Sequence, residues 1–205
     1  NSGGRSTAFE FNYATEQANW SVSQGGTLSV GTDGYGRFTY SAPSAGSAFR
    51  MTNSSFRTVN AGGIDAKHAP IVEIELAYVD ANHAIGSGTD VAEVSLIFQT
   101  ESGGDTWYRA PQSLYATTPV TLGYALNERM YFSMYLHENW DGEIVTALGV
   151  EISARDGKTL KLTNGKINYI RPGYDTRQSN ATYQFILALG NYVAYTNNNA
   201  FLEEM

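Results

Sequence analysis

The chain of 205 residues contains no cysteine. It can therefore form no disulfide, no thiolate nucleophile and no sulfur-rich zinc site. A chain of this length can bury enough apolar surface to fold without covalent cross-links, and one domain is expected. The absence of cysteine does not fix the compartment, because exported proteins can also lack it.

Basic residues and long apolar runs are scarce as well. Thirteen Lys and Arg residues stand against 20 Asp and Glu residues, so the net charge is −7. Nucleic acid binding requires clustered positive charge for the phosphates, so we expect no nucleic acid partner. No apolar run approaches the ~20 residues that a membrane-spanning helix needs, and we expect no membrane insertion.

Charged residues make up only 16% of the chain, whereas Gly (21) and Tyr (14) are abundant. Soluble proteins usually carry about 25% charged residues. Low charge with many Gly and Tyr residues is typical of extracellular β proteins, so we expect an extracellular or virion-associated location. The polar start without Met predicts a fragment or a processed chain of a larger protein.

Short runs in which apolar and polar residues alternate recur along the chain, separated by turn residues. They occur at 8–11, 20–23, 27–30, 37–40, 48–52, 70–78, 92–98, 107–109, 120–124, 130–139, 144–154, 159–162 and 166–170. Hairpins are predicted at Asp33-Gly34, Asp156-Gly157 and Asn164-Gly165. The pattern predicts an all-β fold, a two-sheet antiparallel β-sandwich of jelly-roll type, with an up-and-down barrel as the alternative.

The domain organisation follows from where the strands stop. Residues 1–173 are predicted to form the sandwich, and residues 174–205 a C-terminal extension or linker, or a further part of the same sandwich. The apolar run 183–195 is predicted to be a strand pair, with a helix as the alternative.

The segment 130–139 has the clearest two-faced pattern. On a strand, successive side chains point to opposite faces. The apolar face would then carry Met130, Phe132, Met134 and Leu136, and the polar, aromatic face Tyr131, Ser133, Tyr135 and His137. The second face is either a packing surface or a platform for a flat polar ligand.

Several of these features resemble the jelly-roll carbohydrate-binding modules of polysaccharide-degrading enzymes and phage tail and tail-fibre proteins. They are Phe9-Glu10-Phe11, Trp20, the Gly-rich hairpin after it and the closing strand 166–171. The resemblance covers roughly residues 8–172. It implies a non-catalytic domain whose partner is a carbohydrate or cell-surface glycan.

The resemblance also implies a structural calcium that ties the first strand to the last. Glu10 occupies the early position of that site, and Asn168 stands where the family has Asp. An Asn carbonyl oxygen can still bind calcium, which accepts six to eight mixed oxygen ligands.

A glycan site would need aromatic rings for stacking and polar groups for the sugar hydroxyls. The candidates are Tyr131, Tyr135, Trp107 and Trp140 for stacking, with Arg109, His137 and Gln99 for hydrogen bonding. Trp140 is expected to be exposed on a turn. The same rings could instead pack inside the sandwich, because large aromatic side chains are mostly buried.

Two other functions stay open at this point. Glu73 and Glu93, if they lie on paired strands, could supply the two carboxyl groups of a polysaccharide hydrolase. Tyr135, His137, Gln99 and Arg109 supply the residue types of a polysaccharide lyase. The chain could also be a structural or receptor-binding domain of a phage tail or surface assembly, with its tyrosines in subunit contacts of a homo-oligomer.

Overall fold

The computed structural model describes residues 9–11, 13–55, 62–80, 92–112, 128–154, 157 and 159–173. The chain divides into two units, Asn1–Gly173 and Tyr174–Met205, and all of the described residues belong to the first. The predicted extension 174–205, the apolar run 183–195 and the predicted strand 120–124 lie outside the described residues.

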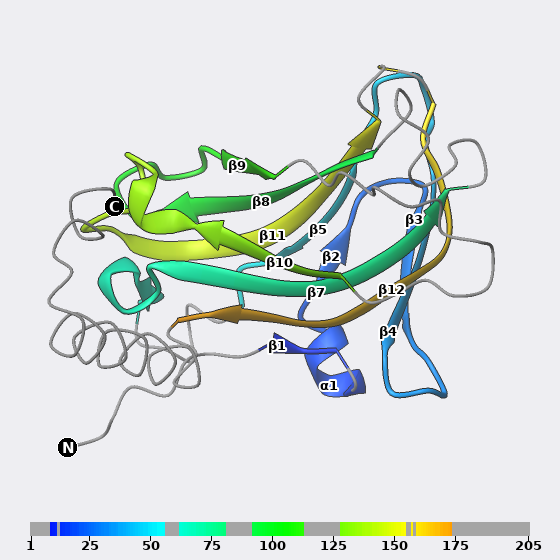
Figure 1. Ribbon diagram of the computed structural model, residues 1–205, viewed down its shortest axis with the longest axis horizontal. Helices are drawn as coiled ribbons and strands as arrows, with labels where there is room; N and C mark the ends of the chain where they lie inside the picture. Colours follow the sequence, from blue (N-terminus) through cyan, green and yellow to red (C-terminus); the bar gives the residue numbers. More distant parts are fainter. Residues whose placement is uncertain are drawn as a thin grey trace, which may run out of the picture. The chain divides into compact units, whose positions relative to one another are not determined.

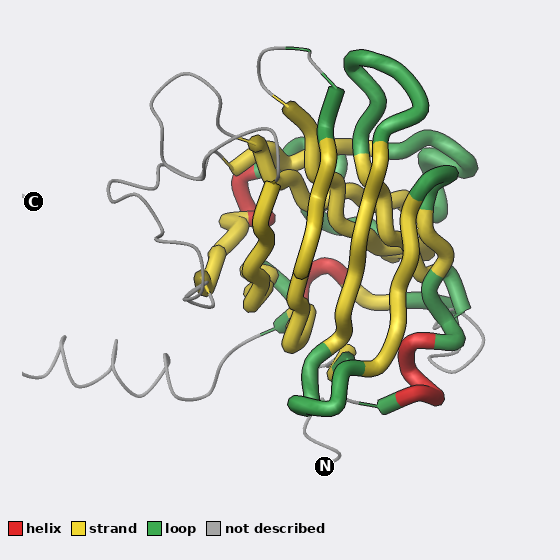
Figure 2. The backbone as a smooth tube through the Cα atoms, turned by 90° about the vertical axis from the view of Figure 1, so that its right-hand side faces the viewer, coloured by secondary structure: helices red, strands yellow, loops and turns green. Residues whose placement is uncertain are grey.

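Two antiparallel sheets of six strands make up the first unit (Figures 1 and 2). Sheet A contains β1 (Phe9–Glu10), β3 (Gly26–Val30), β4 (Gly36–Ser41), β7 (Ile71–Asp80), β10 (Glu128–Ser133) and β12 (Lys161–Pro172). Sheet B contains β2 (Ser21–Val22), β5 (Phe49–Asn53), β6 (Ile64–Asp65), β8 (Ala92–Thr100), β9 (Tyr108–Gln112) and β11 (Ile144–Ala154). The predicted antiparallel β-sandwich of jelly-roll type is confirmed.

The order of the strands places one edge strand of each sheet beside the other. Sheet A runs β10-β7-β12-β4-β3, with β1 paired to β12, and sheet B runs β2-β5-β11-β8-β9, with β6 paired to β11. The edge strands β9 and β10 contact each other across the gap between the sheets. The short helices are α1 (Ala14–Gln17), η1 (Ala66–His68) and η2 (Met134–Leu136). No helix in the described part of the chain is long and apolar enough to cross a membrane.

Alternation in the strands fills the space between the sheets. On β7, Val72, Ile74 and Leu76 point into the core, and Phe98 on β8 does the same. The central strand β11 is buried along nearly its whole length and has neighbouring strands on both sides. Burial of these apolar side chains is the main favourable contribution to folding.

Strands that follow each other in sequence often lie in different sheets. β7 pairs with β10 and β12, whereas β8 pairs with β11 and β9. The predicted carboxylate pair of Glu73 and Glu93 on neighbouring strands is therefore wrong. Their strands belong to opposite layers of the sandwich, so the two residues cannot share one substrate in the way a glycosidase requires.

The segment after β10 also departs from its predicted pattern. The strand ends at Ser133, and the chain then forms the 3₁₀ turn η2. The Tyr135 amide donates to the Pro70 carbonyl (3.0 Å), and the His137 amide donates to the Met134 carbonyl (2.9 Å). This turn keeps Met134 in the core but leaves Leu136 74% exposed, so the predicted burial of Leu136 is wrong.

Trp140 is in the core rather than on the surface. Its side chain is only 1% exposed, and its ring lies edge-on to Phe98 with centroids 4.9 Å apart. The indole N–H donates to the Ala69 carbonyl at 2.9 Å. The expectation of an exposed Trp140 is wrong because a carbonyl distant in sequence satisfies its one polar group and allows the ring to be buried.

The predicted hairpin at Asn164-Gly165 is a bulge inside one long strand. β12 continues through these residues, and its register against β4 shifts between Leu162 and Gly165. Asn164 has a positive φ of 56°, and a Cβ at position 165 would collide with the Phe38 ring. A bulge needs the same permissive residues as a turn, which explains the wrong prediction.

These corrections predict a large loss of stability for one alanine substitution and almost none for another. Trp140→Ala should lower the free energy of unfolding by about 3–5 kcal/mol, because it leaves a cavity beside Phe98. Leu136→Ala should change it by less than about 0.5 kcal/mol, because the side chain lies in solvent. Urea denaturation of the three chains tests this, and a large loss in Leu136→Ala would contradict the exposed turn.

Candidate ligand-binding site

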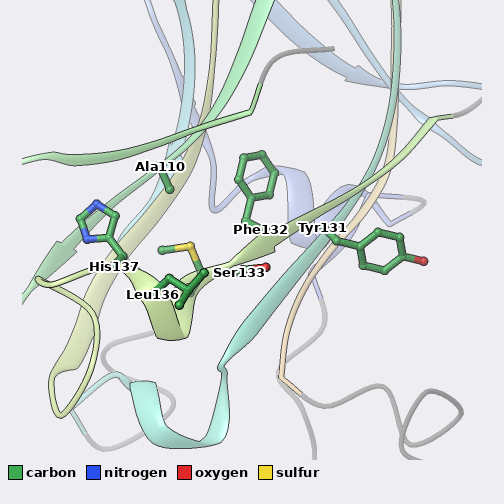
Figure 3. A pocket seen from close by; sticks show the side chains of 7 residues that line it. Ala110, Tyr131, Phe132, Ser133, Leu136 and His137 are labelled. Atoms are coloured by element: carbon green, nitrogen blue, oxygen red, sulfur yellow. The ribbon is translucent and has the colours of Figure 1, made fainter. Parts of the chain in front are cut away.

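A hollow of about 440 Å³ opens at the edge of the sandwich where β9, β10 and η2 meet (Figure 3). We call it the edge hollow. It is lined by Ala110, Tyr131, Phe132, Ser133, Met134, Leu136 and His137. Sheet B contributes one wall through Ala110 on β9, and the rest comes from β10, η2 and His137 just after η2.

The edge hollow has an apolar floor and an exposed rim. Phe132 and Met134 belong to the buried core, whereas Tyr131 is 41% exposed and Leu136 projects into solvent. Figure 3 shows the Tyr131 and Phe132 rings on opposite sides of β10. None of the seven described residues that line the hollow is Asp, Glu, Lys or Arg. This surface favours contact with uncharged, C–H-rich groups.

His137 joins the two walls of the edge hollow. The Asn139 amide donates to its Nδ1 (3.2 Å), so Nε2 carries the proton and donates to the Arg109 carbonyl (3.2 Å). The ring also lies edge-on to Phe98, with centroids 5.0 Å apart. His137 was predicted to bind sugar hydroxyls, but both ring nitrogens are engaged by the backbone of this chain.

The side chains of Arg109 and Gln99 point elsewhere. The Arg109 guanidinium lies 3.0 Å from Glu151 and 3.4 Å from Glu93, on the outer face of sheet B. Gln99 donates from Nε2 to the Asp105 carbonyl at 2.8 Å, within the turn between β8 and β9. Neither side chain lines the edge hollow.

The predicted stacking residues are also distributed over several places. Trp107 is half-buried just before β9, and Tyr135 is 56% exposed on η2; neither lines the hollow. Trp140 lies in the core. Of the seven predicted ligand-binding residues, the structure therefore gathers only Tyr131 and His137 around the hollow.

Three of the remaining lining residues were missed because they look like core residues. The sequence pattern assigned Phe132, Met134 and Leu136 to the buried face of a continuous strand. The turn that exposes Leu136 depends on the Pro70 carbonyl, which is far away in the sequence. The sequence contains no local signal for it.

The two predicted calcium ligands lie where β1 meets β12. Glu10 Oε1 accepts a hydrogen bond from Arg171 Nη2 at 2.8 Å, and the backbone carbonyl of Asn168 accepts one from the Phe11 amide at 2.9 Å. Across the described ranges, no three His, Cys, Asp or Glu side chains cluster as a metal site would require. A guanidinium on Glu10 does not suit a cation that needs six to eight oxygens. Calcium binding stays a prediction, and an ion pair links β1 to β12 here.

A buried polar cluster lies on the outer face of sheet A, next to the rim. The Tyr169 hydroxyl donates to Glu73 Oε1 at 2.7 Å, and the Tyr131 hydroxyl lies 3.5 Å from the same oxygen. Arg171 covers the Tyr169 ring at 3.6 Å. Burial raises the pKa of Tyr169 well above its usual value, and the neighbouring Glu73 and Glu75 carboxylates raise it further.

Comparison with known proteins supports the fold. No protein-family model matches the chain, and no curated protein matches it in sequence. Its fold is similar to that of a carbohydrate-binding module specific for non-crystalline cellulose, CBM28, with a TM-score of 0.55 and 10% identity over 83% of this chain and 97% of that one.

Two further matches are structures from Paenibacillus barcinonensis Xyn10C, the CBM22-1 xylan-binding domain and the CBM22-1-CBM22-2 tandem domain. The single CBM22-1 domain gives a TM-score of 0.40 and 12% identity, over 82% of this chain and 94% of that one. The CBM22-1-CBM22-2 tandem gives 0.39 and 11%, over 86% and 49%. The chain thus has a β-sandwich fold like that of a carbohydrate-binding module, as the resemblance in sequence implied.

The raised pKa of Tyr169 predicts a loss of stability in alkali. In the unfolded chain this hydroxyl ionises near its ordinary value of 10, whereas the folded chain holds the proton to higher pH. The contribution of the Tyr169 hydroxyl to the free energy of unfolding is therefore fully present below pH 10, and it is lost as pH rises from there toward the higher pKa of the folded chain. Tyr169→Phe should show a shallower fall of the free energy of unfolding in denaturation experiments between about pH 9.5 and 11.

Tyr13→Phe, at an exposed position, controls for the loss of one hydroxyl. Burial also raises the pKa of Tyr40, but that residue is present in every variant and cancels in the comparison. If the free energy of unfolding fell equally steeply with pH in wild type and in Tyr169→Phe, the raised pKa of Tyr169 would be contradicted.

Proposed function

We propose that this chain is a non-catalytic carbohydrate-binding module and that its glycan binds in the edge hollow. The observation that carries the proposal is the composition of the hollow. Tyr131 and the exposed Leu136 are among the residues that border an apolar floor, and none of the seven described lining residues is Asp, Glu, Lys or Arg. Sugar rings present C–H faces that pack on such surfaces, with hydroxyls left at the margin.

Polar groups at the margin would orient the sugar. The Ser133 side chain lines the hollow and is exposed. Sugar hydroxyls exchange water hydrogen bonds for protein ones at little net gain. We therefore expect a dissociation constant in the range of about 1 μM to 1 mM.

The fold likeness suggests the first ligands to test. The CBM28 structure is described as specific for non-crystalline cellulose. A neutral glucan fits the uncharged lining of the edge hollow, so non-crystalline cellulose is the natural first probe.

The distribution of the lyase-type residues also supports a non-catalytic role. Gln99 and Arg109 direct their side chains away from the hollow, and His137 uses both ring nitrogens internally. A lyase would need these groups to converge on one sugar. An extracellular or virion-associated setting, as part of a larger protein, remains our expectation from composition.

A second function is favoured by one observation. Three large apolar or aromatic side chains are exposed within six residues of the chain: Tyr131, Tyr135 and Leu136. Exposed apolar side chains also serve as contacts between subunits, for example in a phage tail or a surface assembly. In that case these side chains would be buried in an oligomer.

Binding is tested on a glycan array and on non-crystalline cellulose, with calcium and with a chelator. Tyr131→Ala and Leu136→Ala should each weaken binding about tenfold or more, which corresponds to about 1.4 kcal/mol of lost contact. Tyr13→Ala, an exposed tyrosine (61%) on the flank of α1 outside the lining, is the matched control and should bind like wild type.

Molecular mass in solution separates the two functions. A monomer that binds glycan through Tyr131 supports the proposal. An oligomer that Leu136→Ala dissociates, with no glycan bound under either condition, would replace it with the structural function.

A further inference from the structure

We infer that Arg109 is a positioning residue, whose ion pairs on the outer face of sheet B hold the β9 wall of the edge hollow in place. Arg109 was expected to contact sugar hydroxyls directly. In the structure its guanidinium pairs with Glu151 and Glu93 on the outer face of sheet B, and its backbone carbonyl accepts a hydrogen bond from His137 at the edge hollow. The effect on ligand binding rests on the proposed function, whereas the effect on β9 does not.

The guanidinium is one end of a chain of charges across sheet B. Glu151 on β11 is nearly buried, with 7% of its side chain exposed, and it lies between two arginines. Its Oε2 accepts from Arg50 Nε on β5 at 2.6 Å, and its Oε1 lies 3.0 Å from Arg109 Nε. Glu93 on β8 adds a longer contact to Arg109 at 3.4 Å.

The ion pair between Arg109 and Glu151 spans the strand that lies between them. Arg109 is opposite Ile97 in the β8–β9 register, and Glu151 is opposite Ser95 in the β8–β11 register. The Arg109 side chain must therefore cross β8 to reach Glu151. Ile97 and Ser95 are buried there although they face away from the core, as expected if a side chain lies over them. The edge strand is tied to the centre of the sheet in this way.

The other side of β9 forms the hollow. Ala110 lines it, and the Arg109 carbonyl accepts the Nε2–H of His137, whose ring closes the opposite wall. A displacement of β9 would therefore change the width of the hollow and break the His137 bond together. Because β9 is an edge strand with one described neighbour in its sheet, the ion pairs give it a further attachment, to β11 on the far side of β8.

A preformed wall matters for a weakly bound ligand. Binding to a site that is already ordered avoids the entropy cost of arranging it. The Glu151 side chain is 7% exposed and the Arg109 side chain 40% exposed. Salt therefore screens this ion pair less than one between two fully exposed groups.

The substitution Glu151→Gln distinguishes positioning from direct contact by the sign of its effect. If Arg109 positions β9, the loss of the carboxylate should weaken binding to non-crystalline cellulose about tenfold. If Arg109 contacts the sugar directly, the freed guanidinium should bind it as well as before or better. An unchanged or stronger affinity would therefore overturn the inference.

Amide hydrogen exchange without ligand gives an independent readout. In Glu151→Gln, exchange in a peptide covering Tyr108–Ala110 should become faster by about tenfold or more, because local opening of β9 costs less free energy. A peptide from β4, in the other sheet, should exchange as in wild type. Unchanged exchange in β9 would overturn the inference even if no glycan binds, whereas faster exchange without binding would count only against the proposed function.

Two variants of the arginine and one control complete the test. Arg109→Met keeps the length of the side chain and should reproduce both effects of Glu151→Gln, which also covers the case in which that variant does not fold. Arg109→Lys keeps the charge, so its affinity for cellulose and its amide exchange in β9 should both lie between those of Arg109→Met and wild type. Asp33→Asn removes a comparable carboxylate that pairs with Arg37 at 2.6 Å in the β3–β4 hairpin, and it should change neither readout.

Discussion

The packing around the Phe98 ring is the constraint on which the site depends. This fully buried ring lies within 5.5 Å, centroid to centroid, of Tyr108, His137 and Trp140. The three neighbours come from β9 and from the turns after η2, so one ring of the core positions both walls of the edge hollow. A rigid core of this kind transmits small changes, because protein interiors are close-packed. The hollow is thus a consequence of core packing rather than of a loose surface loop.

The edge of a sandwich is also the place where backbone groups need other partners. A strand at a sheet edge has one row of N–H and C=O groups without a neighbouring strand. Here the Arg109 carbonyl accepts from His137, the Pro70 carbonyl from the Tyr135 amide and the Ala69 carbonyl from the Trp140 indole. The His137 bond joins β9 of sheet B to the chain that follows β10 of sheet A, at the hollow itself. The Tyr135 bond fixes the turn that exposes Leu136, one of the lining residues.

The fold was predictable from sequence because it depends on local periodicity. The alternation in β7, β8 and β11 identified the inner faces, and Asp33-Gly34 was correctly assigned to a hairpin. The site was less predictable because it depends on contacts between distant residues. The turn at Leu136 requires Pro70, and the burial of Trp140 requires Ala69 and Phe98. The period-2 pattern extended through Leu136, so the sequence favoured a longer strand, and the layer to which each strand belongs was not encoded locally.

The charge distribution explains why an acidic protein can present a neutral site. The chain carries a net charge of −7, yet none of the seven described residues that line the hollow is Asp or Glu. Two nearly buried carboxylates elsewhere on the sheets have partners: Glu151 pairs with two arginines, and Glu73 accepts from the Tyr169 hydroxyl. A neutral ligand then meets an apolar surface without displacing any ion pair, so the apolar contact is not offset by the desolvation of charges. An anionic ligand would find no Lys or Arg among the described lining residues, and the net negative charge of the chain would repel it.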